Sequence, residues 1–233
     1  MKSTLHLATA LFVGSFAFGA QEQAPAANPA PFAGTSVKET SRAKPTAENC
    51  AVCHGKEAHE LAGSIHTKAD LRCTSCHGGD PTAIEVAAAH GTQLKKLGTA
   101  REAVESCGGC HADVQRMRLY GLRTDQLSLY WTSKHGERLA KEDDANVATC
   151  VSCHGVHGVL KASDTRSPVH PFNQADTCGR CHGDAAKMAK YGLDPKIVDE
   201  YKSSLYGRAL LQDAHQAAPA CATCHGSHGA APP

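Results

Sequence analysis

Six Cys-x-x-Cys-His motifs constrain this chain more than any other feature. The sequence has 233 residues and 12 cysteines, and every cysteine belongs to one of these motifs. No cysteine is left for a disulfide between distant segments. The motifs are Cys50-Ala-Val-Cys53-His54, Cys73-Thr-Ser-Cys76-His77, Cys107-Gly-Gly-Cys110-His111, Cys150-Val-Ser-Cys153-His154, Cys178-Gly-Arg-Cys181-His182 and Cys221-Ala-Thr-Cys224-His225.

This motif is the attachment signature of c-type haem. Its two thiols bond covalently to the haem vinyl groups, and the adjacent histidine binds iron from the proximal side. Zinc sites also use Cys-x-x-Cys pairs, but zinc chemistry does not require a histidine directly after the second cysteine. A disulfide across a two-residue gap closes a small, strained ring that suits redox chemistry better than structural cross-linking. We therefore predict six covalently attached haem c groups, each with the histidine of its motif as proximal ligand.

The composition agrees with large apolar cofactors. Aromatic residues make up 5% of the chain, so a purely polypeptide core would consist mostly of alanine and leucine. With about thirty residues for each haem, the chain can do little more than wrap its cofactors. Lys plus Arg is 24 and Asp plus Glu is 23. That balance argues against a nucleic-acid binder or a polybasic membrane-surface protein.

The N-terminal region predicts export. Residues 1–20 combine one lysine, a short apolar run and small residues near the end, which is typical of a secretory signal peptide. A retained N-terminal anchor is the alternative, although the run is short for a membrane span. Residues 21–47 are rich in alanine and proline and predict a flexible linker. We expect 48–233 to form an ordered domain in the periplasm or outside the cell, peripheral to a membrane at most.

The C-terminal half repeats itself. Shifting the chain by 71 residues aligns 107–158 with 178–229, including both haem motifs and the pattern Cys-His-Gly-x-His-Gly. This self-similarity indicates duplication of a two-haem unit. The segment 50–77 is a shortened relative, because Ser64-Ile-His66 precedes its second motif much as Ser133-Lys-His135 precedes Cys150.

These patterns resemble the exported multihaem c-type cytochromes. The resemblance rests on Ser-x-His-Gly, on Cys-x-x-Cys-His-Gly-x-His-Gly and on Cys-His-Gly-Gly-Asp-Pro at 76–81, and it covers residues 50–233. It implies a small multihaem cytochrome c fold, bis-His haems packed closely in a chain, and a role in moving electrons.

The distal ligands must come from histidines outside the motifs. Two of the candidates lie in Ser-x-His patterns, two lie three residues after a proximal histidine, and one follows the Gly-Gly-Asp-Pro turn, a placement that fits the same family pattern. These five predicted distal ligands are His66, His135, His157, His228 and His90. Weaker candidates are His59, His170 and His215.

One position breaks the repeat, because His135 aligns with Tyr206. Three explanations stay open: one haem is five-coordinate, Tyr206 ligates iron as tyrosine does in catalase, or His215 replaces the lost ligand. Met117 and Met188 could supply thioethers, but each is followed by a tyrosine three residues on, so packing on a helical face explains them better.

The expected fold is mainly α with much irregular loop, wrapped around a chain of six haems. Segments 112–122, 125–142 and 184–212 predict short helices separated by glycine and proline, and no segment predicts a strand.

The expected function is electron relay, because an iron with two histidine ligands has no free site for substrate. Partners would be redox proteins such as a membrane quinol-oxidising complex or a terminal reductase. An enzyme is the less favoured alternative: a reductase of a small nitrogen or sulfur compound at one open or Tyr-perturbed haem. A subunit of a haem filament or of a larger redox complex is a third possibility, so an oligomer is compatible with the sequence.

Overall fold

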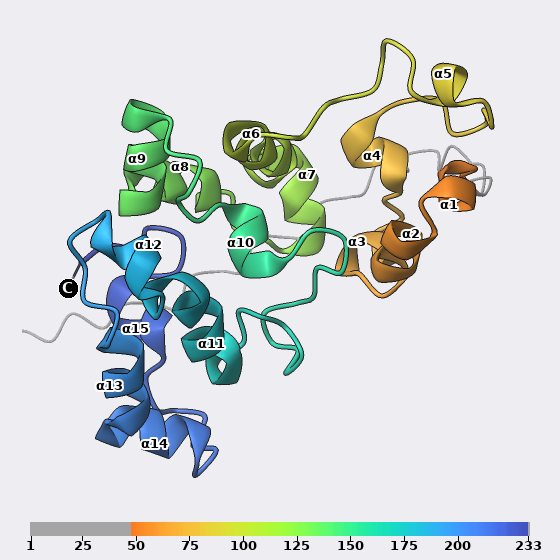
Figure 1. The fold of residues 1–233 in the computed structure, drawn as a ribbon. Helices are drawn as coiled ribbons and strands as arrows, with labels where there is room; N and C mark the ends of the chain where they lie inside the picture. Colours follow the sequence, from red (N-terminus) through yellow and green to blue (C-terminus); the bar gives the residue numbers. More distant parts are fainter. Residues whose placement is uncertain (1–47, 233) are drawn as a thin grey trace, which may run out of the picture. The chain divides into compact units, whose positions relative to one another are not determined.

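The computed structural model describes residues 48–232, which form short helices joined by loops (Figure 1). No strand occurs among these residues. The predicted fold class, mainly α with much irregular loop, is therefore confirmed. The predicted signal peptide (1–20) and linker (21–47) lie outside the described residues.

The helices fall into three consecutive groups along the chain (Figure 1). The first group contains α1 (Cys50–Cys53), α2 (Gly55–Ala62), α3 (Ile65–Lys68), α4 (Cys73–His77) and α5 (Val86–Ala89). The second contains α6 (Ala100–His111), α7 (Val114–Met117), the 3-10 helix η1 (Arg118–Tyr120), α8 (Gln126–Thr132), α9 (Lys134–Glu142) and α10 (Cys150–His154). The third contains α11 (Pro171–His182), α12 (Ala185–Ala189), α13 (Ile197–Ser203), α14 (Leu205–Leu211) and α15 (Cys221–His225).

The second and third groups have matching helices. Each of α6 to α10 begins 71 residues before its counterpart among α11 to α15. Equivalent side chains also make equivalent bonds. The hydroxyl of Tyr130 donates to the carbonyl of Ala148 at 3.0 Å, and that of Tyr201 donates to the carbonyl of Pro219 at 2.9 Å. We call 100–158 the middle segment and 171–229 the last segment.

Local sequence signals explain where these helices begin. Thr99 and Glu102 form a capping box at the start of α6, whereas His170 caps α11 and Pro171 occupies its first turn. Aspartates cap α7 and α12 by accepting two backbone N–H groups each. The predicted helical segments contain α7 to α9 and α12 to α14, but α6 and α11, which lead into haem motifs, lie outside them.

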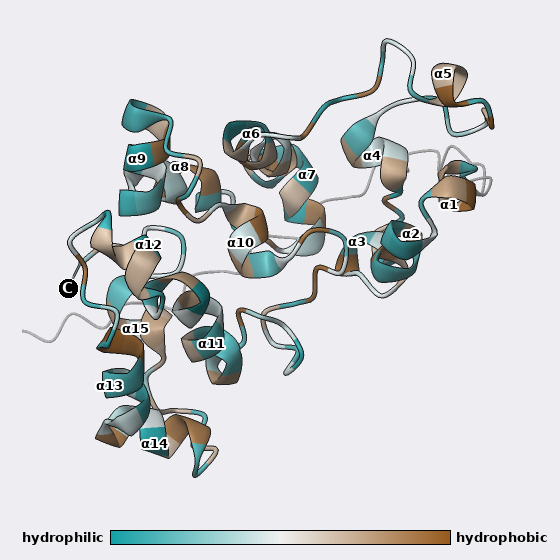
Figure 2. Ribbon diagram, viewed as in Figure 1, coloured by the Kyte–Doolittle hydropathy of each residue, from teal (hydrophilic) through white to brown (hydrophobic). Residues whose placement is uncertain are grey.

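The apolar core of the described residues is small. One buried cluster consists of Val104, Tyr130, Leu139 and Val147, with a few half-buried neighbours. Figure 2 shows that hydrophobic stretches are short and spread over many helices. No helix in residues 48–232 has the length and hydrophobicity needed to cross a membrane.

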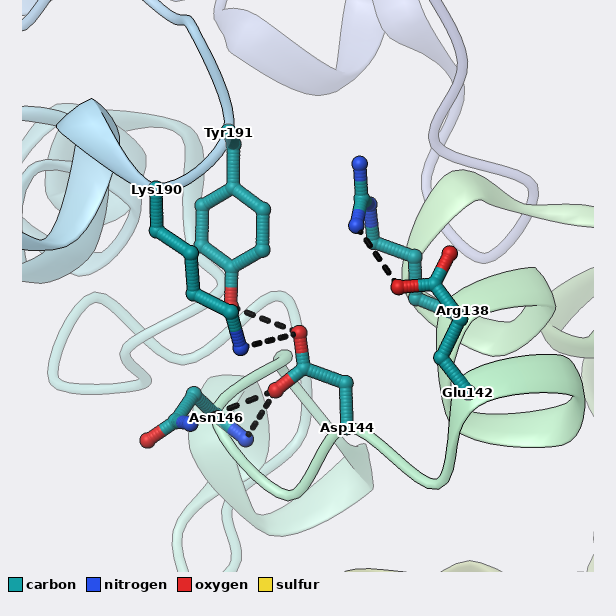
Figure 3. Close-up of polar contacts among 6 residues, drawn as sticks. All are labelled: Arg138, Glu142, Asp144, Asn146, Lys190 and Tyr191. Carbon is teal, nitrogen blue, oxygen red and sulfur yellow. Dashed lines mark hydrogen bonds and ion pairs between the residues drawn. The ribbon is translucent and has the colours of Figure 1, made fainter.

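A buried carboxylate joins the middle segment to the last one (Figure 3). Asp144, which follows α9, is only 6% exposed. It accepts hydrogen bonds from the Lys190 ammonium and the Tyr191 hydroxyl, both at 2.9 Å, and from the backbone N–H of Asn146 at 3.1 Å. The ion pair with Lys190 and the bonds from Asn146 and Tyr191 lower the pKa of this carboxyl.

We predict that Asp144→Asn destabilises the protein in a pH-dependent way. Because the folded state lowers the pKa of Asp144, its stabilising effect is fully present above the unfolded pKa of about 3.9 and is lost as pH falls through the folded value. The difference in unfolding free energy between wild type and variant should therefore be largest near neutral pH and shrink below about pH 4. Denaturant unfolding of the haem-loaded protein across pH measures this difference. The control is Asp143→Asn, since the Asp143 side chain is 84% exposed. Identical pH profiles for the two variants would contradict the prediction.

Candidate functional site

Five of the six motif histidines face a second histidine ring. In every pair, one ring follows a Cys-x-x-Cys sequence and the other does not. The pairs, with the distances between ring centroids, are His54 and His90 at 6.0 Å, His66 and His111 at 6.2 Å, His77 and His157 at 6.3 Å, His135 and His182 at 6.1 Å, and His154 and His228 at 6.1 Å.

This spacing suits one metal ion between two imidazoles. A metal–imidazole bond is about 2 Å and each ring nitrogen lies about 1 Å from its ring centre, so two imidazoles on opposite sides of one ion have centres about 6 Å apart. The donor set therefore fits haem iron with two histidine ligands.

Burial favours the neutral form of several of these imidazoles. It lowers the pKa of His66, His111 and His135, and the neighbouring imidazole lowers the pKa further for His66 and His135. Burial also lowers the pKa of His228, although Asp125 opposes the shift. A neutral imidazole keeps the lone pair with which histidine binds metal.

The Ser-x-His-Gly pattern fixes the direction of His135. Ser133 is fully buried; its hydroxyl donates to the carbonyl of Tyr130 at 2.6 Å and accepts the N–H of Gly136 at 3.0 Å, which caps α9. A Cβ at Gly136 would overlap the carbonyl of Tyr130. Only glycine therefore allows α9 to start this close to the end of α8.

Ser64 does the same for His66 in the first group. Its hydroxyl accepts the N–H of His66 at 3.1 Å and donates to the carbonyl of Val159 at 3.1 Å. The N–H of Ile65 also donates to Val159, at 2.8 Å. The loop after α10 thus holds the helix that carries His66.

Paired rings come from different helix groups in four of the five pairs. His135 of the middle segment faces His182 of the last segment, and His228 of the last segment faces His154 of the middle one. The first group and the middle segment exchange histidines in the same way, through the pairs His66 with His111 and His157 with His77. Neighbouring groups therefore complete each other's sites.

The first cysteines of the six motifs form three neighbouring pairs: first with second, third with fourth, and fifth with sixth. In the first pair, the thiols of Cys50 and Cys73 and a carboxylate oxygen of Glu48 lie within 4.8 Å of one another. A hydrogen bond to Cys150, together with burial, raises the pKa of the Cys107 thiol. The same arrangement with Cys221 raises the pKa of Cys178. The motifs thus form three close pairs in chain order.

The three motif pairs also adjoin one another. Burial and the nearby thiols of Cys107 and Cys110 raise the pKa of Cys76, which links the second motif to the third. Burial raises the pKa of Cys153, and the Cys181 thiol adds to this effect, which links the fourth motif to the fifth. The six motifs therefore follow one another in space in the order in which the chain presents them.

The sixth motif histidine lacks a facing ring within residues 48–232. His225 is instead held by its own loop, with Nδ1 2.8 Å from the carbonyl oxygen of Ala231.

The weaker ligand candidates are not brought to any motif histidine. His59 and His215 are exposed. The ring of His170 packs against Phe172 at 4.9 Å. Met117 and Met188 are buried, at 7% and 4% exposure, among packed side chains.

Tyr206 is 60% exposed. Its position in the repeat explains why it is tyrosine where the middle segment has His135. His135, its counterpart, faces His182 of the following segment and not a histidine of its own segment. Tyr206 thus stands at the place of a ring that faces a neighbouring segment, and within residues 48–232 it stacks against no motif histidine.

Glu48 is a site residue that the sequence analysis missed. Its carboxylate accepts the backbone N–H of Cys73 at 2.8 Å and of Thr74 at 3.3 Å, and it also accepts the Thr74 hydroxyl. Burial alone would raise the pKa of Glu48, but these hydrogen bonds outweigh it and lower the pKa. An isolated glutamate before a motif resembles any solvated acid, so no sequence signal marks this role.

Comparisons with known proteins agree with this geometry. Residues 131–226 match the family described as cytochrome c7 and related cytochrome c. The chain is 26% identical over 141 residues to the multiheme cytochrome MtrA of Shewanella baltica (strain OS185), an alignment that covers 57% of this chain and 41% of the relative. The aligned region thus spans about two fifths of that relative. No solved structure gives a significant match. The two matches point to a multihaem cytochrome with covalently bound haem c.

We predict that Gly136→Ala destabilises the haem-loaded protein by about 2 to 3 kcal/mol, because the added methyl group must displace the backbone of Tyr130. Gly207→Ala should have a similar effect, since its Cβ would overlap the carbonyl of Tyr201. The control is Gly98→Ala, a position with no atom within 4 Å of an added Cβ. Thermal unfolding of the three variants measures the differences. Equal midpoints for the variants at Gly136 and Gly98 would refute this account.

Proposed function

We propose that this chain is an exported multihaem c-type cytochrome that relays electrons between redox partners through six closely packed, mostly bis-His haems. The observation that supports this best is the set of five histidine pairs, each 6.0–6.3 Å between ring centroids. Each pair joins a motif histidine to a histidine from elsewhere in the chain. Six adjacent iron centres would supply a path along which electrons move one at a time.

The chain's own residues have three roles in this proposal. The twelve motif cysteines anchor the haems covalently, and the six motif histidines are the proximal ligands. The distal ligands are His66, His90, His135, His157 and His228. With both axial positions filled by histidine, an iron changes oxidation state without binding substrate.

The arrangement of the motifs supports a linear relay. Cysteines of neighbouring motifs lie near enough to influence one another's pKa, in chain order, so an electron that enters near Cys50 would leave near Cys221 or the reverse. Histidine pairs also give lower potentials than a methionine–histidine pair, because thioether ligation raises the potential. The proposed relay therefore works at low potential.

The partners are proposed to be redox proteins in the periplasm, such as a membrane quinol-oxidising complex on one side and a terminal reductase on the other. The near-neutral polypeptide, with 24 basic and 23 acidic residues, becomes distinctly acidic once haem propionates are added, unless lysine and arginine match them. Docking would then favour basic partner surfaces.

A second function, reduction of a small nitrogen or sulfur compound, is favoured by one observation. Within residues 48–232, no second ring faces His225. Against it, all six motifs keep histidine at the proximal position, and a bis-His site does not bind substrate.

We predict that His157→Ala converts one of the six haems from low spin to high spin, because His77 loses the ring that faces it. His59→Ala is the control, since His59 is exposed and faces no motif histidine. Electron paramagnetic resonance of the oxidised protein counts the haems in each state. A low-spin count unchanged by His157→Ala would exclude the proposed pairing.

We also predict that the chain does not fold without haem, because its apolar cluster of four buried residues is too small to stabilise the described helices. Expression in a host that lacks cytochrome c maturation should give no stable product, whereas the same host with maturation restored should give protein with six haems. Soluble, protease-resistant apoprotein in the deficient host would be the opposite result.

A further inference from the structure

His77, His154 and His225 are the last motif histidines of the three helix groups, and His225 differs from the other two. His77 in α4 faces His157, and His154 in α10 faces His228. In both pairs, the facing histidine belongs to the next helix group and lies three residues after the last motif histidine of that group. His225 in α15 holds the equivalent place in the last segment. A ring that served it by the same rule would have to come from a further segment packed beside the last one.

The last segment does not carry the side-chain contacts that receive such a neighbour. In the middle segment these contacts are the ring of His135 facing His182 and Asp144 bound to Lys190, beside a backbone bond from the N–H of Lys134 to Ala230 at 3.3 Å. Seventy-one positions later, Leu205 keeps the backbone N–H, but Tyr206 and His215 replace the two side chains.

These replacements remove the side-chain contacts. Leu205 and Tyr206 are 73% and 60% exposed, and His215 is exposed as well. The phenol of Tyr206 takes the place of the His135 imidazole. The imidazole of His215 takes the place of the Asp144 carboxylate, which binds Lys190 and Tyr191. A neighbouring segment of the same kind would therefore find neither a ligand for its haem nor a partner for its lysine.

Two histidines that face no motif histidine have other surroundings. His215 is exposed, and its backbone N–H donates to the carbonyl of Ala209 at 2.9 Å. His170 caps α11 by accepting the N–H of Phe172 at 3.3 Å.

His225 itself is oriented to bind iron. Because a carbonyl oxygen only accepts hydrogen bonds, the contact of Nδ1 with Ala231 at 2.8 Å places the proton on Nδ1 and leaves the lone pair on Nε2. The proximal side of this site is thus complete.

The part of the last segment that corresponds to the surroundings of His228 is polar. In the middle segment, Asp125 and Arg123 lie near His228, and Leu129 lies close to Gly229. The counterparts in the last segment are Lys196, Asp194 and Glu200, all of them exposed. A charged, exposed residue thus replaces leucine.

From this geometry we propose that the haem bound by Cys221, Cys224 and His225 has an exchangeable distal position, which takes small exogenous haem ligands such as cyanide, carbon monoxide, nitric oxide or nitrite in place of water. The inference rests on the proposed function, because it presupposes haem at this motif. It assigns the open position to the sixth motif rather than to a haem perturbed by Tyr206.

The test uses the purified, haem-loaded full chain. The oxidised protein should show one high-spin haem in six, and cyanide should convert it to low spin at one equivalent per chain. The reduced protein should bind one carbon monoxide per chain. Tyr206→Phe and His215→Ala should leave all three results unchanged.

A matched variant separates this inference from the proposed function. His228→Ala removes the ring that faces His154 and should add one high-spin haem and one carbon monoxide site. If wild type is wholly low spin and binds no carbon monoxide while His228→Ala gains one site, the open position is wrong and the relay stands. If His228→Ala adds no site, the ligand pairing of the proposed function is wrong too.

Two further outcomes would overturn the inference. A low-spin wild type that becomes high spin in His215→Ala would make His215 the sixth distal ligand. A high-spin signal that appears only on dilution would mean that a second copy of the chain supplies the ligand.

Discussion

Reciprocal exchange of histidines between neighbouring helix groups is the constraint around which the described chain is organised. The rings of each pair lie about 6 Å apart, the spacing that one iron between two imidazoles would need, and four of the five pairs take their rings from different groups. The buried serine caps, the glycine that lets α9 start close to α8, and the Asp144 ion pair all fix the relative position of helices that carry paired rings.

This organisation explains why so little polypeptide core is present. In an ordinary domain of this length, long amphipathic helices bury a continuous apolar face. Here the helices have at most twelve residues, and many begin at a side-chain cap or end in a haem motif. Covalent thioethers and axial ligands would replace packing as the chief source of order, so the loops can be long and irregular without loss of precision at the ligands.

Much of this was predictable from the sequence, because covalent attachment leaves a fixed local motif and duplication leaves a fixed spacing. The helical segments at 112–122, 125–142 and 184–212 followed from their composition and from the glycine and proline that separate them. The pairing of rings was not predictable, since four of the five non-motif histidines face a motif histidine in another helix group and no local spacing records that choice. For the same reason, the exchange of His135 for Tyr206 looked like a lost ligand. It becomes intelligible only when His135 is seen to face His182.

The 71-residue spacing determines how the chain could gain or lose repeated segments. Because histidines are exchanged only between adjacent groups, a whole period can be removed between equivalent points. Joining Lys134 directly to Tyr206, for example, removes His135 together with its partner His182 and leaves the pairs of the first group intact in kind. His228 would then take the place of His157 opposite His77. Insertion of a period works in the same way. The number of Cys-x-x-Cys-His motifs can therefore grow or shrink in steps of two, while the segments at both ends of the row stay the same.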